Sequence, residues 1–118
     1  MHVMHVIEVR ESSEGSVLVE LRGEFDRHNL GDLRETLDAV LALRRPTVVD
    51  LSGVIFLDVG ATRELTIRSR LYAHHLTLHN PSPEVRASVA ACGFEEWLDF
   101  HSDPKDSSCR RAPARTTS

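Results

Sequence analysis

The sequence has few aromatic residues and no excess of positive charge. It holds one Trp, one Tyr and four Phe among 118 residues, and 14 basic side chains against 18 acidic ones, for a net charge of −4. Proteins that bind single-stranded nucleic acid need aromatic platforms on which bases stack. Binding to nucleic-acid backbones or to anionic membranes needs basic patches. The composition therefore argues against nucleic acid and membrane surfaces as partners.

Long apolar runs and a disulfide framework are also missing. No run approaches the length of a membrane span, and His2, His5 and Glu8 interrupt the apolar residues that a signal peptide would need. The two cysteines do not make a framework. We expect Cys92 to pack as a small core residue and Cys109 to lie in a tail without a function. With 41% hydrophobic residues, the chain is predicted to be one cytoplasmic domain.

The first part of the sequence predicts a hairpin followed by a helix. Residues 3–9 and 16–23 alternate between apolar and polar side chains around a short polar turn, which favours two antiparallel strands. The range Asp26–Arg44 has the apolar spacing of a helix, with Asp26 or Asn29 as its cap. The apolar stripe of this helix consists of Leu30, Leu33, Leu37, Val40 and Leu41.

The central stretch, Pro46–Leu65, predicts a strand, an apolar loop and a second helix. The strand is Thr47–Leu51, and the turn residues Ser52-Gly53 follow it. Exposing the four apolar side chains of the loop 54–57 would cost roughly 1.5–3 kcal/mol each. The loop is therefore expected to enter the core or to meet a partner. Asp58 then occupies the N-cap position of the second helix.

The second helix has a weaker apolar pattern, and we expect it to end at His74-His75. The side chains expected to face the core are Ala61, Leu65 and Tyr72. Those expected to point outward are Val59, Arg63, Thr66 and Arg70. Arg68 is predicted to lie at the edge with its charged head in water. Its i,i+4 pairing with Glu64 would contribute only about 0.3–0.5 kcal/mol.

The last part of the sequence predicts a short strand at residues 76–80 and a third helix that begins at Ser82 and Pro83. Its buried face is expected to hold Val85, Val89 and Cys92. A final apolar cluster consists of Phe94, Trp97, Leu98 and Phe100. Residues 102–118 lack an apolar pattern and are predicted to be a disordered tail after a domain of residues 1–101. The order of elements predicts a single α/β domain, a mixed sheet with an opening hairpin and about three packed helices.

Four segments, in order and at matching spacing, carry a family resemblance: Gly23-Glu24-Phe25-Asp26, Val48–Val54 followed by Phe56-Leu57-Asp58, Leu76-Thr77-Leu78 with Asn80-Pro81-Ser82, and Cys92-Gly93-Phe94. Together they resemble the motifs of STAS domains, the family of sulphate transporters and anti-sigma factor antagonists. The resemblance covers roughly residues 3–100. It implies a bacterial regulatory domain with the STAS fold.

The resemblance also implies a switch, and the sequence departs from it. Family antagonists bind anti-sigma factors that are serine kinases, and phosphorylation of the Ser or Thr after the motif Asp releases the partner. A phosphate there adds about −1.5 to −2 charges. Here the usual D-S-[ST]-G is Asp58-Val59-Gly60-Ala61, and Val59 has no hydroxyl. Thr62 is the nearest hydroxyl, at a position that is usually apolar in the family, where we expect it to be half-buried.

Two functional hypotheses follow. In the first, the chain is a constitutive or scaffolding antagonist that binds an anti-sigma factor or a serine-kinase-like regulator. The expected partner surface consists of Asp26, Arg27, His28, Asp58, Val59, Gly60, Thr62 and Arg63. In the second, a small ligand or nucleotide binds at the N-terminus of the second helix. We favour the first, because the Asp58 carboxylate opposes an anion and Val59 makes the surface apolar.

Catalytic, cofactor and metal sites are not expected. Asp26 and Asp58 form a possible carboxylate pair, but capping two helices is the better interpretation. His75 and His79 lie on either side of a helix end and a strand, so they share no helical face that would hold a metal. The resemblance further implies that the polar residues 102–118 replace a last helix, which would leave a docking face open around Trp97.

Overall fold

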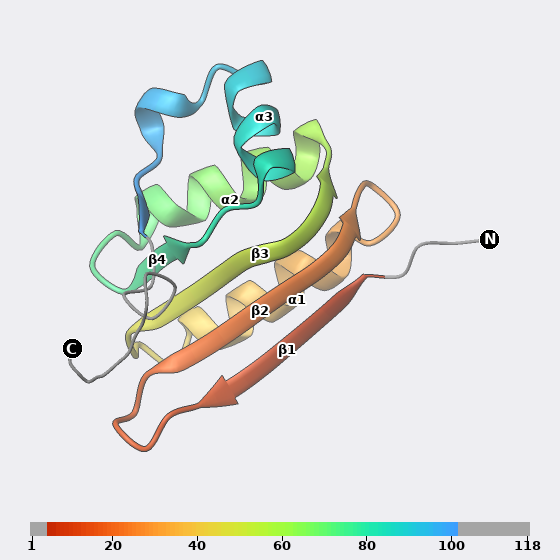
Figure 1. Cartoon of the computed structure of the whole chain (residues 1–118). Coiled ribbons are helices and arrows are strands. Elements are labelled where there is room, and N and C mark those ends of the chain that lie inside the picture. Colours follow the sequence, from red (N-terminus) through yellow and green to blue (C-terminus); the bar gives the residue numbers. More distant parts are fainter. Residues whose placement is uncertain (1–4, 102–118) are drawn as a thin grey trace, which may run out of the picture.

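The computed structural model describes residues 5–101 and contains one five-stranded sheet with three α-helices (Figure 1). The elements in chain order are β1 (Val6–Glu11), β2 (Val17–Phe25), α1 (Leu30–Leu41), β3 (Thr47–Leu57), α2 (Val59–Leu71), β4 (Leu76–His79), α3 (Pro83–Ala91), the 3-10 turn η1 (Glu95–Trp97) and β5 (Phe100–His101). The strands lie side by side in chain order; β1 is antiparallel to β2, and the other neighbours are parallel. The predicted mixed sheet, opening hairpin and three helices are confirmed.

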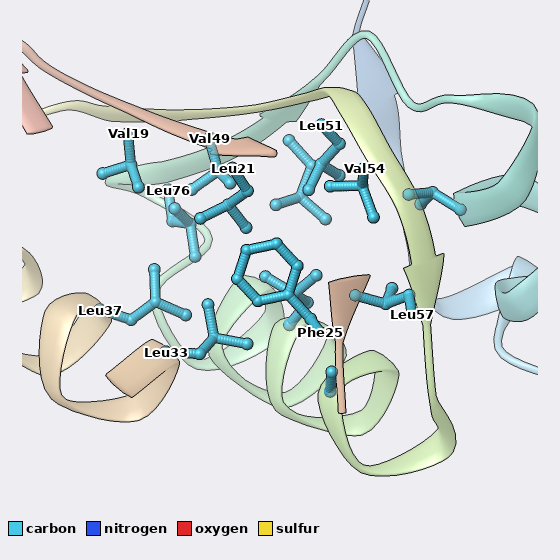
Figure 2. Close-up of a cluster of buried hydrophobic side chains, with 14 of the residues drawn as sticks. Val19, Leu21, Phe25, Leu33, Leu37, Val49, Leu51, Val54, Leu57 and Leu76 are labelled. Atoms are coloured by element: carbon cyan, nitrogen blue, oxygen red, sulfur yellow. The ribbon is translucent and has the colours of Figure 1, made fainter. Parts of the chain in front are cut away.

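The core lies between one face of the sheet and the helices α1 and α2 (Figure 2). Successive side chains of a strand point to opposite faces of the sheet, so every second residue from Val17 to Leu21 in β2 and from Thr47 to Leu51 in β3 is buried. Leu33 and Leu37 are four residues apart in α1 and share its inner face. The side chains that meet from the strands include Val19, Leu21, Phe25, Val49 and Leu51, each at most 1% exposed.

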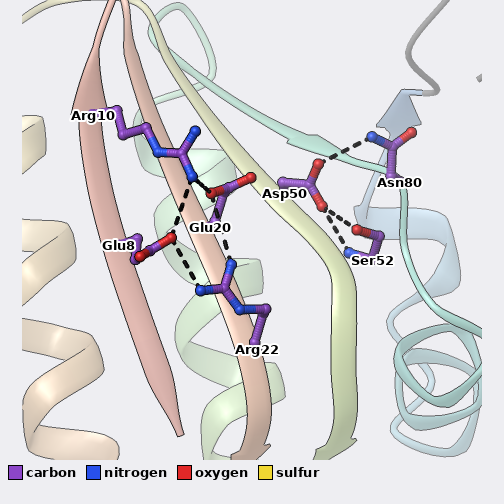
Figure 3. Close-up of polar contacts among 7 residues, drawn as sticks. All are labelled: Glu8, Arg10, Glu20, Arg22, Asp50, Ser52 and Asn80. Carbon is purple, nitrogen blue, oxygen red and sulfur yellow. Dashed lines mark hydrogen bonds and ion pairs between the residues drawn. The ribbon is translucent and has the colours of Figure 1, made fainter. Parts of the chain in front are cut away.

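The opposite face of the sheet is polar. Glu8 and Arg10 of β1 form ion pairs with Arg22 and Glu20 of β2 (Figure 3): Arg10 Nη2 lies 2.8 Å from Glu20 Oε1, and Arg22 Nη2 lies 3.0 Å from Glu8 Oε1. Hydrogen bonds from Arg22 and then Arg10 lower the pKa of Glu8. Asp50 continues this polar face on β3, where its carboxylate accepts hydrogen bonds of its own (Figure 3). The charges keep this side of the sheet compatible with water.

Strand β3 is much longer than the sequence predicts. The residues 52–57, predicted to be a turn and an apolar loop, continue the strand as far as Leu57. Pairing with β2 continues to its end, with register shifts between Glu20 and Arg22 and between Gly23 and Glu24. These irregularities break the alternation of side chains that identifies a strand in a sequence. A neighbouring strand with nine residues available for pairing therefore overrides the local turn signal of Ser52-Gly53.

The second half of β3 extends beyond β4, and α3 covers the free edge that results. Ser82 Oγ donates to the Val54 carbonyl at 2.6 Å, and Ser88 Oγ donates to the Leu57 carbonyl at 2.8 Å. Unpaired strand edges are otherwise sites of aggregation. Ser82 also caps α3 by accepting from Val85 N–H, which confirms the predicted helix start. The hydroxyls of Ser82 and Ser88 thus satisfy two β3 carbonyls to which a neighbouring strand would otherwise donate.

The helices α1 and α2 are shorter than the sequence predicts. Helix α1 begins at Leu30 rather than Asp26, because the residues before it form a separate turn. It ends at Leu41, and tight i→i+3 hydrogen bonds then turn the chain, with Arg44 in the left-handed conformation at φ +57°. Helix α2 ends at Leu71, before His74-His75.

Helix α2 buries Ala61 and Leu65 and exposes Val59, Arg63 and Arg70 as predicted, but three other side chains differ from the prediction. Thr66, expected to point outward, is 3% exposed, whereas Tyr72, expected to face the core, is 38% exposed. The Arg68 side chain is only 14% exposed, and its Nη2 lies 2.9 Å from Asp38 Oδ1 of α1 rather than in water. Apolar periodicity misplaced these three residues because polar side chains share the inner face of α2 with Ala61 and Leu65.

The C-terminal apolar cluster divides between the core and the surface. Leu98 is buried, and Phe94 and Phe100 pack on the core while half-buried. Trp97 is 53% exposed, beneath the Arg70 guanidinium, whose carbon lies 4.8 Å from the ring centroid. Cys92 is half-buried rather than part of the core.

No helix in residues 5–101 is long and apolar enough to cross a membrane. The predicted tail at 102–118 lies outside the described residues.

Replacing Arg44 tests whether its backbone conformation is strained. A side chain other than Gly pays roughly 1–2 kcal/mol in the left-handed region. Arg44→Gly is expected to raise the free energy of unfolding by about 0.5–1 kcal/mol in urea denaturation. Arg44→Ala removes the same charge but keeps the Cβ, so it is the matched control. Equal stabilities of the two variants would contradict the strain.

Candidate functional site

The loops after β2 and β3 lie side by side at the carboxyl ends of these strands. Phe25 and Leu57, the last residues of the two strands, are partners in the parallel ladder. The backbone N–H of Asp58 donates to the Phe25 carbonyl at 3.0 Å. The predicted site residues at 26–28 and 58–63 are therefore brought together, although the two segments are about 30 positions apart in the chain.

Asp58 caps α2 as predicted. Its Oδ1 accepts from Ala61 N–H at 2.8 Å, and its backbone carbonyl accepts from Thr62 N–H at 2.9 Å. A carboxylate at this position is stabilised by the positive end of the helix dipole. It also places a negative charge where an anionic ligand would bind, which weighs against the ligand hypothesis.

Asp26 does not cap α1. Its Oδ1 accepts from His28 N–H at 2.9 Å, while Asn29 Oδ1 accepts from Asp26 N–H at 2.9 Å. Asn29 stands at the N-cap position of α1 but makes no side-chain capping bond, because its amide oxygen and nitrogen are engaged with Asp26 and Glu24. These bonds hold the loop in shape and leave Arg27 and His28 exposed.

The first turn of α2 exposes the apolar side chain of Val59 and buries the hydroxyl of Thr62. Val59 is 58% exposed, and Arg63 is exposed one turn later. Thr62 was expected to be half-buried, but it is only 1% exposed, and its Oγ1 donates to the Asp58 carbonyl at 2.7 Å. Both the burial and the hydrogen bond weigh against Thr62 as a modification site.

Gly60 makes no contact that requires a glycine. A Cβ built there would meet Leu30 Cδ2 of α1 at 3.5 Å and Asp58 Oδ1 at 3.5 Å, which are ordinary packing distances. Gly53 is different, because a Cβ at that position would lie 2.5 Å from Arg22 Cγ. The close approach is therefore that of the Arg22 side chain to the backbone of β3, and the start of α2 has no comparable contact at Gly60.

Ile55 and Phe56 join the candidate site, and neither was among the predicted site residues. They are 49% and 46% exposed, whereas Val54 and Leu57 on either side are fully buried. The signal in the sequence was the apolar run 54–57, because such a run is expected to enter the core or to meet a partner. The strand places two of the four apolar side chains of residues 54–57 inside and leaves the other two in solvent.

A family model described as "Mlab, STAS domain" matches residues 8–99, which is most of the chain. The chain belongs to the STAS-domain family. A comparison with curated proteins finds no significant match.

Solved structures share the STAS fold with this chain. An anti-sigma factor antagonist from Mycobacterium paratuberculosis superposes with a TM-score of 0.70 at 21% sequence identity, covering 90% of this chain and 91% of that chain. The anti-sigma factor antagonist SpoIIAA in its unphosphorylated form superposes with a TM-score of 0.60 at 19% identity, covering 86% of this chain and 92% of that chain. At these identities the likeness establishes the fold.

An ion-pair network holds α1 against α2 in this STAS domain. Glu64 of α2 accepts from Arg34 of α1 at 2.8 Å and also pairs with Arg68, which in turn binds Asp38 of α1. The Glu64–Arg68 pair is thus part of an interhelical network and not an isolated surface pair. Burial alone would raise the pKa of Glu64, but hydrogen bonds and charge from Arg34 and Arg68 lower it below its ordinary value.

The histidines considered as metal ligands do not meet. Within residues 5–101, no group of three or more His, Cys, Asp or Glu side chains is arranged to hold a metal ion. His74 and His75 follow the end of α2. His79 belongs to β4, where its ring stacks on His101 of β5 with 5.1 Å between centroids.

Acid should weaken the Glu64 network. Because the pKa of Glu64 is lower in the folded state than the ordinary 4.5, its contribution is present above that pH and lost as pH falls through the folded value. Glu64→Gln should lower the free energy of unfolding by about 1–2 kcal/mol at pH 7, and the difference from wild type should shrink at pH 3. Urea denaturation at both pH values measures this. Glu35→Gln, on exposed α1 surface, is the control; an unchanged gap at pH 3 would contradict the assignment.

Gly60→Ala should stabilise the domain. The packing at this position accepts a methyl group, and alanine has a higher helix propensity than glycine, so we expect a gain of about 0.5 kcal/mol in thermal or urea unfolding. Gly53→Ala, with its 2.5 Å approach to Arg22, should destabilise the domain instead. A loss of stability in Gly60→Ala would indicate that the first turn of α2 needs glycine.

Proposed function

We propose that this STAS domain is a regulatory protein-binding module of the anti-sigma factor antagonist type, without catalytic activity. Its partner would be an anti-sigma factor or a related serine-kinase-like regulator. The contact surface would be formed by the two adjacent loops and the first turn of α2. The family membership and the shared fold with two anti-sigma factor antagonists support this proposal.

The observation that carries the proposal is the exposed Val59. It follows directly after the capping Asp58, where the family resemblance expects a phosphorylatable hydroxyl, and 58% of its surface faces solvent. A phosphate there would place about −1.5 to −2 charges beside the Asp58 carboxylate in a protein contact. Valine prevents that change, so the surface stays permanently in its binding state.

The chemistry of the surface favours a protein over a small ligand. Ile55, Phe56 and Val59 offer apolar area, and Arg27 and Arg63 offer exposed charge beside it. Protein interfaces combine an apolar centre with arginine and a polar rim. An anion at the N-terminus of α2 would instead meet the Asp58 carboxylate, which already accepts the Ala61 N–H.

Substitutions at position 59 test the proposal. Wild type, Val59→Ser and Val59→Asp are used as baits in extract of the native cell, and mass spectrometry identifies captured proteins and phosphorylation of the bait. Wild type should capture an anti-sigma factor, and Val59→Asp should lose it, because a charge in an apolar contact typically costs at least about tenfold in affinity. Val59→Ser should be recovered phosphorylated.

Val9 supplies matched controls. It is 46% exposed on β1, the far edge strand of the sheet, so Val9→Ser and Val9→Asp repeat the same chemistry away from the surface. Both controls should capture the partner as wild type does. Equal capture by all three position-59 baits, or capture by none, would refute a partner surface at the start of α2.

A further inference from the structure

Helix α2 exposes apolar residues although it buries several polar ones. A helix packed on a sheet normally buries an apolar stripe and exposes a polar one. In α2 the side toward the protein carries Ala61 and Leu65 together with four polar residues that are buried or nearly so, whereas its outer side carries three exposed apolar residues beside two exposed arginines. The inward polar residues are Thr62, Glu64, Thr66 and Arg68. The outward apolar residues are Val59, Ile67 and Leu71.

The inward polar groups are accounted for by contacts within the domain. Thr62 Oγ1 donates to the Asp58 carbonyl, and Thr66 Oγ1 donates to the Thr62 carbonyl at 2.8 Å. Glu64 and Arg68 belong to the network that holds α1. Nothing in residues 5–101 gives a corresponding reason for the apolar outer side, and an ordered apolar row on a surface marks an interaction site.

The outer residues form one continuous row along the helix. Val59, Arg63, Ile67 and Leu71 recur every four residues, the spacing that places side chains on one face. Val59, Ile67 and Leu71 are 58%, 42% and 73% exposed. At 1.5 Å per residue the row is about 18 Å long, which is the length of a three-turn helix. It begins at the surface proposed above and continues well beyond it. We call this row the α2 ridge.

Two arginines of the outer side have no acidic partner among residues 5–101. Arg34 and Arg68 are both paired with carboxylates, but Arg63 and Arg70 make no ion pair within the described part of the chain. Arg70 lies instead over the ring of the exposed Trp97. Positive charge therefore alternates with apolar area along the ridge, in a chain whose overall charge is negative.

We infer that the α2 ridge docks an acidic amphipathic helix of the partner protein. The ridge offers the i/i+4 row that packs into a facing helix. Arg63 and Arg70 fit Asp or Glu side chains on the flanks of that helix. The inference rests on the proposed function for its first turn, at Val59, and extends the interface to Leu71.

The charges also argue against a second copy of this chain on the ridge. A two-fold dimer contact brings the same surface patch of both molecules together. Two ridges packed in this way would bring Arg63 and Arg70 of one copy close to the same residues of the other. Like charges held together in an interface cost affinity. An acidic partner helix removes this repulsion.

The end of the ridge offers a place for an anchoring side chain. A hollow of about 410 Å³ lies beside Leu71, the last residue of the ridge. The rest of its lining consists of Leu41, Ala42, Arg44, Tyr72, His74 and His75. Anchors that fill such hollows dominate the energy of many interfaces. The partner helix is therefore expected to extend along the ridge as far as Leu71 and not to stop at the first turn.

Site-specific photo-crosslinking in extract of the native cell tests the inference. Benzoylphenylalanine is placed in the full chain at position 59, 67 or, as a control on β1, position 9. The proposal predicts crosslinks from positions 59 and 67 to one protein. The peptide attached at 67 should carry Asp or Glu beside apolar residues spaced three or four apart. Arg63→Glu in the same chain should reduce the yield at 67 about tenfold, and an acidic-to-lysine change in the partner should restore it.

The outcomes separate this inference from the proposed function. Crosslinks at 59 without crosslinks at 67 would overturn the ridge and leave the proposed function standing. Crosslinks at neither position would overturn both. Attachment of 67 to a second copy of this chain, or to a segment without acidic residues, would also overturn the acidic-helix inference. So would a yield at 67 no greater than at position 9.

Discussion

The parallel pairing of β2 with β3 is the constraint on which the rest of the structure depends. It brings Phe25 and Leu57 to the same end of the sheet, and the following residues of each strand enter adjacent loops. The Asp58 N–H then bonds to the Phe25 carbonyl, and its carboxylate starts α2. Because both loops leave from the same edge, two segments distant in the chain form one surface.

Polar contacts act beside the apolar core in holding the elements together. Ser82 and Ser88 close the free edge of β3, and the Glu64 network fixes α2 against α1. Hydrogen bonds and ion pairs satisfy the polar residues on the inner side of α2, and several apolar residues of this helix lie on its outer side. The proposed antagonist surface and the proposed α2 ridge both include these outward apolar residues, because an apolar outer side gains stability only when a partner covers it.

Much of the fold and part of the site could be predicted from the sequence. The hairpin, the order of the elements, the Asp58 cap and the Ser82 start of α3 depend on neighbouring residues, and each was confirmed. The length of β3 was wrong, because nine residues of β2 supply pairing that overrides the turn signal of Ser52-Gly53. The inner face of α2 was right at Ala61 and Leu65 but wrong at Arg68, which reaches Asp38, 30 positions away. Apolar periodicity carries no record of such a pair.

The sequence by itself determined the local features of this protein: its alternating strands, the capping residues and the absence of a hydroxyl at Val59. These depend on side-chain chemistry and on bonds within a few residues. Only the tertiary structure decided that Thr62 is buried, that Ile55 and Phe56 are exposed, and that α2 turns an apolar ridge outward. Those properties depend on which elements cover each side chain, and that cover comes from strands and helices far away in the chain.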